Sequence, residues 1–467
     1  MEEDREKHLA ATREGVPASQ DAPLPEGTSH GLLEMMEASS LARLPNPGEA
    51  AAVTEDVIDR INRDFPAEVL QRPSHSDRRQ VEASIAAAVR SAAARKGLSI
   101  PEAAFDGLCA DLARRLMGLG FLDLLLPPAR NDITEIAIYS SGLIQGMSKR
   151  SVRWKTIDMR VPPAEIWRVL DRLLGPQNKV LNEANPSVHA RLPASEHNPG
   201  GGRIKALHPA IVPPGRNPAV NIRLFEQAPV HPNWLIEMGL ASKEVFDELR
   251  NAVGEGLRIL ISGGTRTGKT TLLSALCNYL PKEWRIVKIE DPQEIWIDRN
   301  AVQTIEARPA AVGTEVRPYS LADGVDDALR LSPDYLIVGE VRDGKAALAL
   351  FRAMMTGHSG MCTFHAYTPG QALERLATVM AADTGVARDD ALEMISSSID
   401  MVVQLRICDE VRRIASVHRV WRRHGSSGIR LRPMFRFIPE SSPDAPEWEC
   451  LWTPKGGVRE TREEEGA

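Results

Sequence analysis

The sequence predicts an α/β protein whose core is a largely parallel sheet covered by helices, preceded by a smaller α+β domain. Strand-like and helix-like stretches alternate from residue 234 to about residue 408, which is the pattern that produces such a sheet. A glycine-rich segment, GGTRTGKTT at 263–271, lies between the apolar run LRILI and the helix-like run KTTLLSALCNYL. Residues 121–225 instead hold one helix-like stretch among short strand-like stretches, which favours a separate α+β domain.

Composition limits the class of protein. The chain has 467 residues, enough for two or three domains. Its net charge of −6 gives no reason to expect sequence-independent binding to nucleic acid. Five scattered cysteines without a CxxC pair indicate reduced thiols. No apolar run approaches the ~20 residues of a membrane span, and the first residues lack a secretory signal. We therefore expect a cytoplasmic protein that reaches a membrane only through partners.

The division of the chain follows from composition and periodicity. The start is rich in Glu, Pro, Ser and Ala, with one short helix expected near 30–44. Helical periodicity then begins, with Val81, Ile85 and Val89 at four-residue spacing, and strands from 401 to 437 are expected to extend the sheet in antiparallel fashion. The predicted parts are a mostly disordered leader (1–75), a helical segment (76–120), the α+β domain (121–225), a linker (226–233), the core domain (234–437) and a tail (438–467) whose last stretch, PKGGVRETREEEGA, is expected to be solvated.

The glycine-rich segment matches the pattern G-x-x-x-x-G-K-[ST] through Gly263, Gly268, Lys269 and Thr270. Glycines let backbone N–H groups turn towards phosphates, and the positive end of the following helix faces their charge. Lys269 would then reach the β- and γ-phosphates, and the Thr270 hydroxyl would contact Mg²⁺. The alternative is a glycine-rich turn that only starts a helix. The flanking strand and helix favour a nucleotide-binding loop made of Gly263, Gly264, Thr265, Arg266, Thr267, Gly268, Lys269, Thr270 and Thr271.

Two acidic positions follow strand-like stretches. Glu290 and Asp291 end the stretch RIVKIED, and Glu340 follows YLIV and Gly339. Because the carboxyl ends of parallel strands form the ligand crevice of such a sheet, these acids are expected near the phosphates. A glutamate in the position of Glu340 can orient or activate the attacking water. The alternatives are a solvated acidic turn for the first pair and an acid that only caps a helix for Glu340.

Two histidines, His358 and His365, bracket the short strand-like stretch in TGHSGMCTFHA. Their spacing of seven, without a cysteine or acidic companion, argues against a zinc site. Sequence chemistry leaves two possibilities open: structural histidines, or groups that sense the γ-phosphate.

Five segments in order, GGTRTGKTT, IEDPQEI, IEARP, LRLSPDYLIVGEVRDG and GHSGMCTFHA, resemble the motifs of the type II/IV secretion and pilus ATPase superfamily. They are similar to its phosphate loop, Asp box, arginine-proline segment, second nucleotide motif and His box. The likeness covers about residues 115–437 and is strongest to the tight-adherence (Flp) pilus branch, the CpaF-like family. It implies a RecA-like P-loop fold for the core domain, with ATP and Mg²⁺ as cofactors.

The resemblance also implies residue roles. Lys269 and Thr270 would serve phosphate and Mg²⁺, Glu290 would help hold the metal–water shell, and Glu340 would be the catalytic glutamate. The His-box contacts would come from His358 and His365. Relatives place arginines close to the nucleotide at four further positions, which here are Arg308, Arg191, Arg203 and Arg223. These arginines would either contact the nucleotide or only form surface salt bridges.

Arg266 departs from the family pattern, because this loop position usually holds a small residue. It would either add a phosphate contact or hinder closure. Gly339 also stands where the second motif often has an aspartate.

The function that the resemblance implies is ATP hydrolysis by a cytoplasmic homohexamer. The work would move pilin or secreted protein through an inner-membrane platform protein. Two alternatives stay open: a DNA-transfer ATPase of a conjugation apparatus, and a nucleotide switch that barely hydrolyses. A small-molecule kinase is disfavoured because nothing resembles an acceptor-binding lid.

Overall fold

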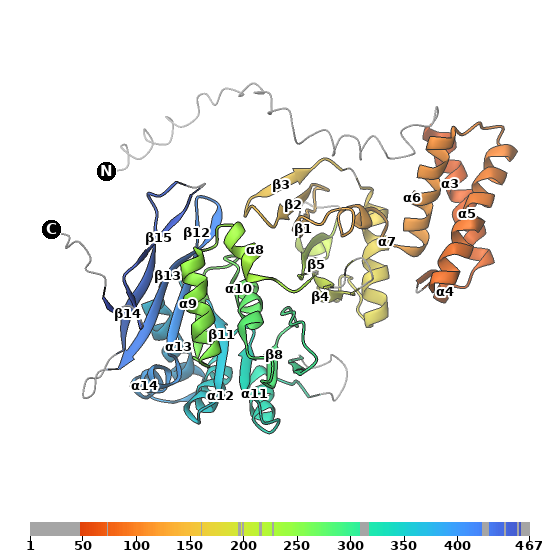
Figure 1. The fold of residues 1–467 in the computed structure, drawn as a ribbon. Coiled ribbons are helices and arrows are strands. Elements are labelled where there is room, and N and C mark those ends of the chain that lie inside the picture. The colour runs from red at the N-terminus through yellow and green to blue at the C-terminus, as the bar shows by residue number, and fades with distance from the viewer. Residues whose placement is uncertain are drawn as a thin grey trace, which may run out of the picture. The chain divides into compact units, whose positions relative to one another are not determined.

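The structure is a computed structural model that describes residues 47–71, 73–159, 161–194, 198, 200–213, 217–226, 228–308, 317–422, 429–442, 445–454 and 457–458. It divides into two compact units, residues 1–120 and 121–467, and Figure 1 traces the elements of each. The short helix expected near 30–44 lies outside the described residues.

The first unit is helical. Its elements are α3 (Pro47–Asp64), α4 (Ala67–Gln71), α5 (His75–Arg95) and α6 (Glu102–Met117). Apolar residues at four-residue spacing on α3, such as Val57 and Ile61, are buried with Ile85 of α5 and Leu108 of α6 in one core. The prediction of a disordered leader over 1–75 is therefore wrong from residue 47 onward. The polar composition concealed a narrow apolar stripe that becomes stable only when packed against other helices.

The second unit begins with a six-stranded antiparallel sheet, called here the small sheet, in the order β3-β2-β1-β6-β5-β4. Helix α7 (Pro163–Leu174) packs against β4 and buries Ile166, Val169 and Leu170. Inward and outward residues alternate along β4 and β5, as expected for a sheet with one covered face. The strands are β1 (Ile133–Ile138), β2 (Ile144–Ser148), β3 (Trp154–Ile157), β4 (Ser187–Leu192), β5 (Gly202–Leu207) and β6 (Ala219–Leu224).

The rest of the second unit is built on a nine-stranded sheet, called here the large sheet, in the order β15-β14-β13-β12-β7-β11-β10-β8-β9. The strands from β12 to β9 in this order are parallel, and β13, β14 and β15 extend the sheet in antiparallel fashion. The α/β class predicted from the sequence is confirmed. The strands are β7 (Ile259–Gly263), β8 (Ile286–Glu290), β9 (Val302–Glu306), β10 (Tyr335–Val338), β11 (Ser359–Phe364), β12 (Met401–Cys408), β13 (Val411–Arg422), β14 (Ile429–Ile438) and β15 (Glu447–Cys450).

Helices cover both faces of the large sheet because its strands are apolar on both sides. On β7, Ile259 and Ile261 face one core and Leu260 faces the other. The first core includes residues of α8 (Pro232–Glu237), α9 (Lys243–Gly254) and α10 (Lys269–Leu276), the helices that Figure 1 draws in green in front of the blue strands. The second core includes residues of α11 (Leu321–Leu329), α12 (Gly344–Met355), α13 (Pro369–Thr384) and α14 (Arg388–Ser398).

The predicted tail, 438–467, is wrong in its first part. Strand β15 pairs with β14, and Trp448 packs against the first core and donates a hydrogen bond to the carbonyl of Ile414 at 2.7 Å. A short pair, β16 (Trp452–Thr453) and β17 (Gly457–Val458), follows. The alternating Glu447, Trp448, Glu449 and Cys450 carried the strand signal, which the acidic composition masked.

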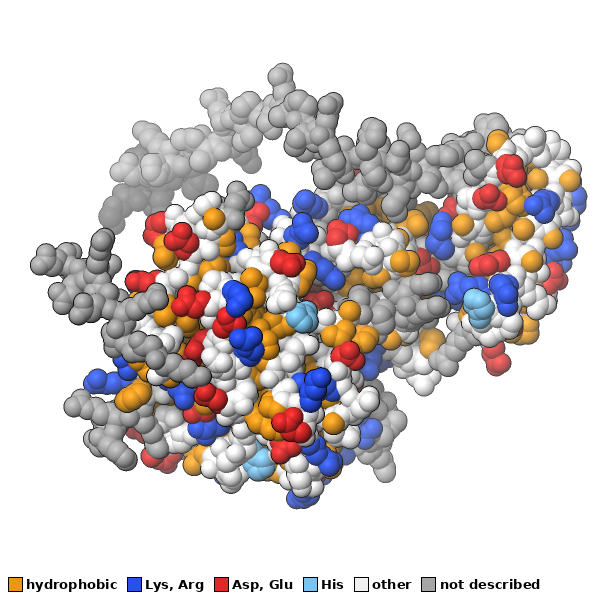
Figure 2. Space-filling model, in the orientation of Figure 1, with side chains coloured by type: hydrophobic (Ala, Val, Ile, Leu, Met, Phe, Trp, Pro, Cys, Tyr) orange, Lys and Arg blue, Asp and Glu red, His pale blue; other side chains and the backbone are white. Residues whose placement is uncertain are grey.

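Basic and acidic side chains are interspersed on the face of the molecule that Figure 2 shows. Among the described residues, no helix combines the length and apolar character needed to cross a bilayer.

Arg258 fixes the amino end of the large sheet, and its removal is expected to destabilise the second unit. Its guanidinium donates to both Asp400 oxygens at 2.8 and 2.9 Å and to the carbonyls of Met354 and Ser397. Arg258→Met removes these side-chain donors and leaves the partly buried Asp400 with only the Arg258 backbone N–H, so we expect a loss of about 2 kcal/mol of unfolding free energy in urea denaturation. Arg250→Met, which breaks an exposed pair with Asp247, is the control and should cost under about 0.5 kcal/mol. Equal losses in both variants would contradict this role.

Candidate nucleotide site

The phosphate loop connects β7 to α10. Gly268 has φ 91° and Arg266 has φ 63°, which turn the loop back on itself before the helix begins. A Cβ atom at Gly263 would lie 2.5 Å from the Thr267 hydroxyl oxygen, so this position requires glycine. The Thr267 hydroxyl donates to the Gly264 carbonyl at 2.9 Å and closes the loop. The sequence pattern thus has a structural cause at each glycine that it uses.

The carboxyl ends of four parallel strands meet beside this loop. Strand β7 delivers the loop, β8 delivers Glu290, β10 delivers Glu340 and β11 delivers His365. They border a cavity of about 740 Å³, within the usual size of a small-molecule site. Its lining side chains are Glu135, Arg203, Asn221, Arg223, Thr265, Arg266, Lys269, Thr270, Thr271, Glu290, Asp291, Pro292, Glu294, Glu340, Arg342 and His365, together with Gly268 and Gly339.

Lys269 is held at the base of the cavity. Its ammonium donates to the carbonyls of Gly263 and Gly264 at 3.1 and 2.8 Å, and its Nζ lies 3.1 Å from Nδ1 of His365. Burial lowers the pKa of Lys269 to about 8, although the nearby Glu340 carboxylate favours the charged form. A bound anion would therefore strongly favour the protonated, charged form of Lys269.

Glu340 is bound from two sides. Nε2 of His365 lies 2.5 Å from one carboxylate oxygen, and Nε of Arg342 donates to the other at 2.7 Å. A neutral His365 with its proton on Nε2 satisfies both Glu340 and Lys269. Burial raises the pKa of Glu340, but the hydrogen bonds from His365 and Arg342 outweigh it and hold the pKa at about 2. Glu340 is thus an anion throughout the physiological range.

Glu290 borders the cavity but is committed to the protein. One oxygen accepts the backbone N–H groups of Glu294 and Ile295 at 2.9 and 2.8 Å, and the other accepts from Lys288 at 2.9 Å. Burial raises its pKa, and these donors oppose that shift. Only 1% of Glu290 is exposed. Both oxygens thus already accept hydrogen bonds from the protein, so a contact of Glu290 with the Mg²⁺ water shell stays a prediction and would use the acceptor capacity that these bonds leave.

The packing of Glu290 also explains the glycine in the second nucleotide motif. A Cβ atom at Gly339 would lie 3.1 Å from Cγ of Glu290. A side chain at position 339 would therefore need the Glu290 side chain to shift by a few tenths of an ångström.

Three arginines form a row on the small sheet. Arg191, Arg203 and Arg223 are direct cross-strand neighbours on β4, β5 and β6. Because like charges directly opposite each other on neighbouring strands repel, each of these arginines is stabilised by a nearby anion. Arg203 and Arg223 reach Glu294 at 3.7 and 3.9 Å and line the cavity, whereas Arg191 pairs with Glu306 outside it.

Two further predicted residues, His358 and Arg308, do not line this cavity. His358 precedes β11 and His365 follows it, so the six-residue strand separates them by about 20 Å. Nδ1 of His358 lies 3.0 Å from the Ala353 carbonyl oxygen, at the opposite edge of the sheet. Arg308 is exposed, forms a backbone bridge with Tyr319 and does not line the cavity.

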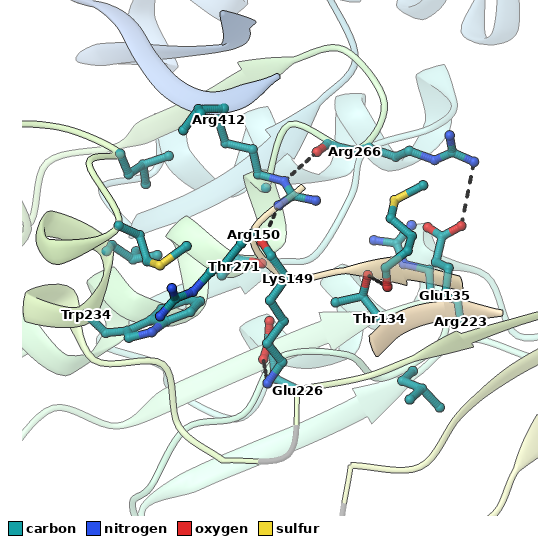
Figure 3. A pocket seen from close by; sticks show the side chains of 17 residues that line it. Thr134, Glu135, Lys149, Arg150, Arg223, Glu226, Trp234, Arg266, Thr271 and Arg412 are labelled. Atoms are coloured by element: carbon teal, nitrogen blue, oxygen red, sulfur yellow. Dashed lines mark hydrogen bonds and ion pairs between the residues drawn. The ribbon is translucent and has the colours of Figure 1, made fainter. Parts of the chain in front are cut away.

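A second, smaller cavity of about 130 Å³ adjoins the first and shares Glu135, Arg223, Arg266, Gly268 and Thr271 with it. Figure 3 shows its walls, which combine the apolar side of α8, the first turn of α10 and the small sheet. Arg266 turns its guanidinium towards Glu135.

Several of these residues were missed in the sequence. Lys288 carried a usable signal, because a lysine in an otherwise apolar strand, two residues before Glu290, lies on the same face. Arg342 likewise follows Glu340 by two residues. Glu135 and Glu294 gave no local signal, since their partners are distant in sequence.

Fold and site together define a protein that presents a phosphate-binding loop at the edge of a parallel α/β sheet. The chain belongs to the type II/IV secretion system protein family, whose profile matches residues 165–436, more than half of its length. An uncharacterized protein of Methanocaldococcus jannaschii is 32% identical over 269 residues, which cover 57% of this chain and 46% of that protein. This chain thus spans about half the length of that relative.

A relative described as probable conjugal transfer protein TrbB of Sinorhizobium fredii is 31% identical over 250 residues, covering 53% of this chain and 70% of that protein. Among solved structures, the ATPase DotB of Legionella pneumophila has a TM-score of 0.45 at 20% identity, covering 64% of this chain and 78% of that chain.

Binding of a phosphate ligand should weaken at alkaline pH because of Lys269. With a pKa of about 8, only about one chain in ten carries the ammonium at pH 9, so the affinity for ADP should fall about tenfold between pH 7 and pH 9. The sign follows because the cation is lost as pH rises, and a bound phosphate favours the protonated form. Calorimetric titration of ADP at several pH values measures this. In Lys269→Arg the dependence should vanish, and equal wild-type affinities at pH 7 and pH 9 would contradict the assignment.

Proposed function

We propose that this protein hydrolyses ATP to ADP and phosphate with Mg²⁺, and that the hydrolysis powers protein secretion or pilus assembly. The observation that carries the proposal is the single cavity in which Lys269, Thr270, Glu340 and His365 meet two arginines of the small sheet. Membership of the type II/IV secretion system protein family supports secretion or pilus assembly as the process that the hydrolysis powers.

The donor chemistry of the cavity fits a triphosphate. The amino end of α10 and Lys269 supply positive charge at the base, and Arg203 and Arg223 supply it from the opposite wall. Phosphate oxygens would compete with Glu294 for these two arginines. Binding would therefore draw the small sheet and the loop onto the same ligand.

The site also fits a Mg²⁺ ion held mainly by its substrate. Among the described residues, no three His, Cys, Asp or Glu side chains converge as a metal cluster. Mg²⁺ in phosphate-transfer sites keeps several waters and takes one or two protein oxygens. The Thr270 hydroxyl and the partly exposed Asp291 carboxylate border the cavity and could supply them. When bound, the ion neutralises charge on the transferred phosphoryl group.

Glu340 is assigned the role of positioning the water that attacks the γ-phosphate. A carboxylate with a pKa of about 2 accepts a proton poorly, so its role is to orient the water rather than to deprotonate it fully. His365 and Arg342 hold the carboxylate in place. His365 also contacts Lys269. A ligand bound to Lys269 would therefore change the contacts of His365, the residue that holds the Glu340 carboxylate.

The finer assignment is to the tight-adherence (Flp) pilus branch, the CpaF-like family, as a cytoplasmic homohexamer bound to an inner-membrane platform protein. The ordered sequence motifs support this branch, and arginines on the small sheet suit sites that are completed by subunit packing. A second candidate is DNA transfer in conjugation, which the TrbB relative favours. A weakly hydrolysing switch would use the same loop.

Glu340→Gln should separate binding from turnover. The amide keeps the shape but loses the anion, so we expect ATP hydrolysis to fall by about a hundredfold or more while ADP affinity stays within about threefold. Phosphate release by the purified full chain measures turnover. Lys269→Ala should lose both binding and turnover, and Arg436→Gln, on the exposed surface of β14, is the control. Equal turnover in Glu340→Gln and in the wild type would contradict this role, and it would favour the nucleotide switch if the wild type itself barely hydrolyses ATP.

Crosslinking in the native membrane should capture the platform partner. If the protein powers a pilus or secretion system, the integral protein identified by mass spectrometry should be encoded with pilins or a prepilin peptidase. Capture of components encoded with a relaxase would instead support DNA transfer and overturn the pilus assignment.

A further inference from the structure

We infer that Arg266 is a positioning residue that ties the phosphate loop to the small sheet through Glu135 and Trp154, so that binding at the loop orders β1 and β3. The inference rests on the proposed function, because the loop ligand is taken to be a nucleotide. It concerns a loop residue with a positive φ that lines the cavity.

The first contact is with a carboxylate that needs a cation. Glu135 on β1 is only 6% exposed, and Arg266 Nη2 lies 3.6 Å from its Oε2. Arg223 is the cross-strand neighbour of Glu135, but its guanidinium reaches Glu294 instead. Within the described ranges, Arg266 is the only cation within 4.0 Å of Glu135. A buried carboxylate without a counter-ion is unfavourable, so the small sheet depends on the loop here.

The second contact is on another strand. The Arg266 guanidinium carbon lies 5.3 Å from the centre of the Trp154 ring, at the start of β3. A guanidinium over an indole face is attracted by the ring. Arg266 thus contacts β1 and β3, which flank β2 in the small sheet.

The backbone of Arg266 is held separately. Arg412, at the start of β13, donates from Nε to the Arg266 carbonyl at 2.8 Å and from Nη1 to the Lys149 carbonyl at 2.7 Å. Figure 3 shows Arg412 between these two carbonyls, with the Arg266 side chain extending away from it towards Glu135. The residue is therefore fixed at both ends while its φ of 63° lies in the left-handed region.

The consequence is a thermodynamic coupling. A ligand that fixes the loop favours the Arg266 conformation that pairs with Glu135, and by linkage the docked small sheet favours the ligand-binding loop. Arg203 and Arg223 join the small sheet to the cavity by a separate route, through β5 and β6. The two routes predict different responses on different strands.

Hydrogen exchange of the full chain with and without ADP tests the inference. In the wild type, ADP should slow amide exchange about fivefold in 133–138 and 154–157 as well as in 202–207. In Glu135→Gln, and in Arg266→Gly, the slowing in 133–138 and 154–157 should fall below about twofold, while that in 202–207 remains. Glycine is chosen because it accepts the positive φ without strain. ADP affinity should fall about fivefold in both variants.

Arg130→Gln is the matched control, because it breaks the ion pair with Asp132 just before β1 without touching the loop. Its response to ADP should equal that of the wild type. Undiminished slowing in 133–138 and 154–157 in both variants would overturn the inference. A wild-type protein that does not bind ADP at all would instead refute the proposed function, so the two failures are distinguishable.

Discussion

Strand direction is the constraint on which the site depends. Because β7, β8, β10 and β11 are parallel, whatever follows each strand lies at one edge of the large sheet. This places His365 within hydrogen-bonding distance of both Lys269 and Glu340, although the three residues are far apart in sequence. Charged groups gathered in a partly buried place must neutralise each other, and the chain from Lys269 through His365 and Glu340 to Arg342 is the result. Burial lowers the pKa of Lys269, and the hydrogen bonds from His365 and Arg342 lower that of Glu340.

The small sheet supplies complementary charges of both signs. Its row of neighbours across β4, β5, β6 and β1 consists of three arginines followed by Glu135. The arginines reach acids of the large-sheet domain, and Glu135 reaches Arg266 of the loop. A triphosphate would compete with the acids for Arg203 and Arg223 but not with Glu135 for its partner. One part of the interface would then exchange partners on binding while the other persists, and this would be a physical route from ligand binding to domain movement.

The sequence allowed the α/β class, the order of the strands along the chain and the chemistry of the loop to be predicted, because these depend on local periodicity and on a short motif. Prediction from the sequence failed for features that depend on contacts between residues far apart in the chain. The donors that hold Glu290, Lys288 and two later backbone N–H groups, were not foreseen because they become visible only once the chain folds back. His358 was grouped with His365, although a strand between two residues already places them at opposite edges. The helices before residue 72 were hidden by polar composition that leaves only a narrow apolar stripe.

The central claim is that a triphosphate is bound between Lys269 and Glu340 at this edge of the sheet. The most direct measurement is a crystal structure of the full chain with Mg²⁺ and a non-hydrolysable ATP analogue. The account predicts phosphate oxygens within about 3.2 Å of the Lys269 ammonium, with the Glu340 carboxylate facing the terminal phosphate. An analogue bound elsewhere, or a terminal phosphate with Glu340 turned away from it, would contradict the account.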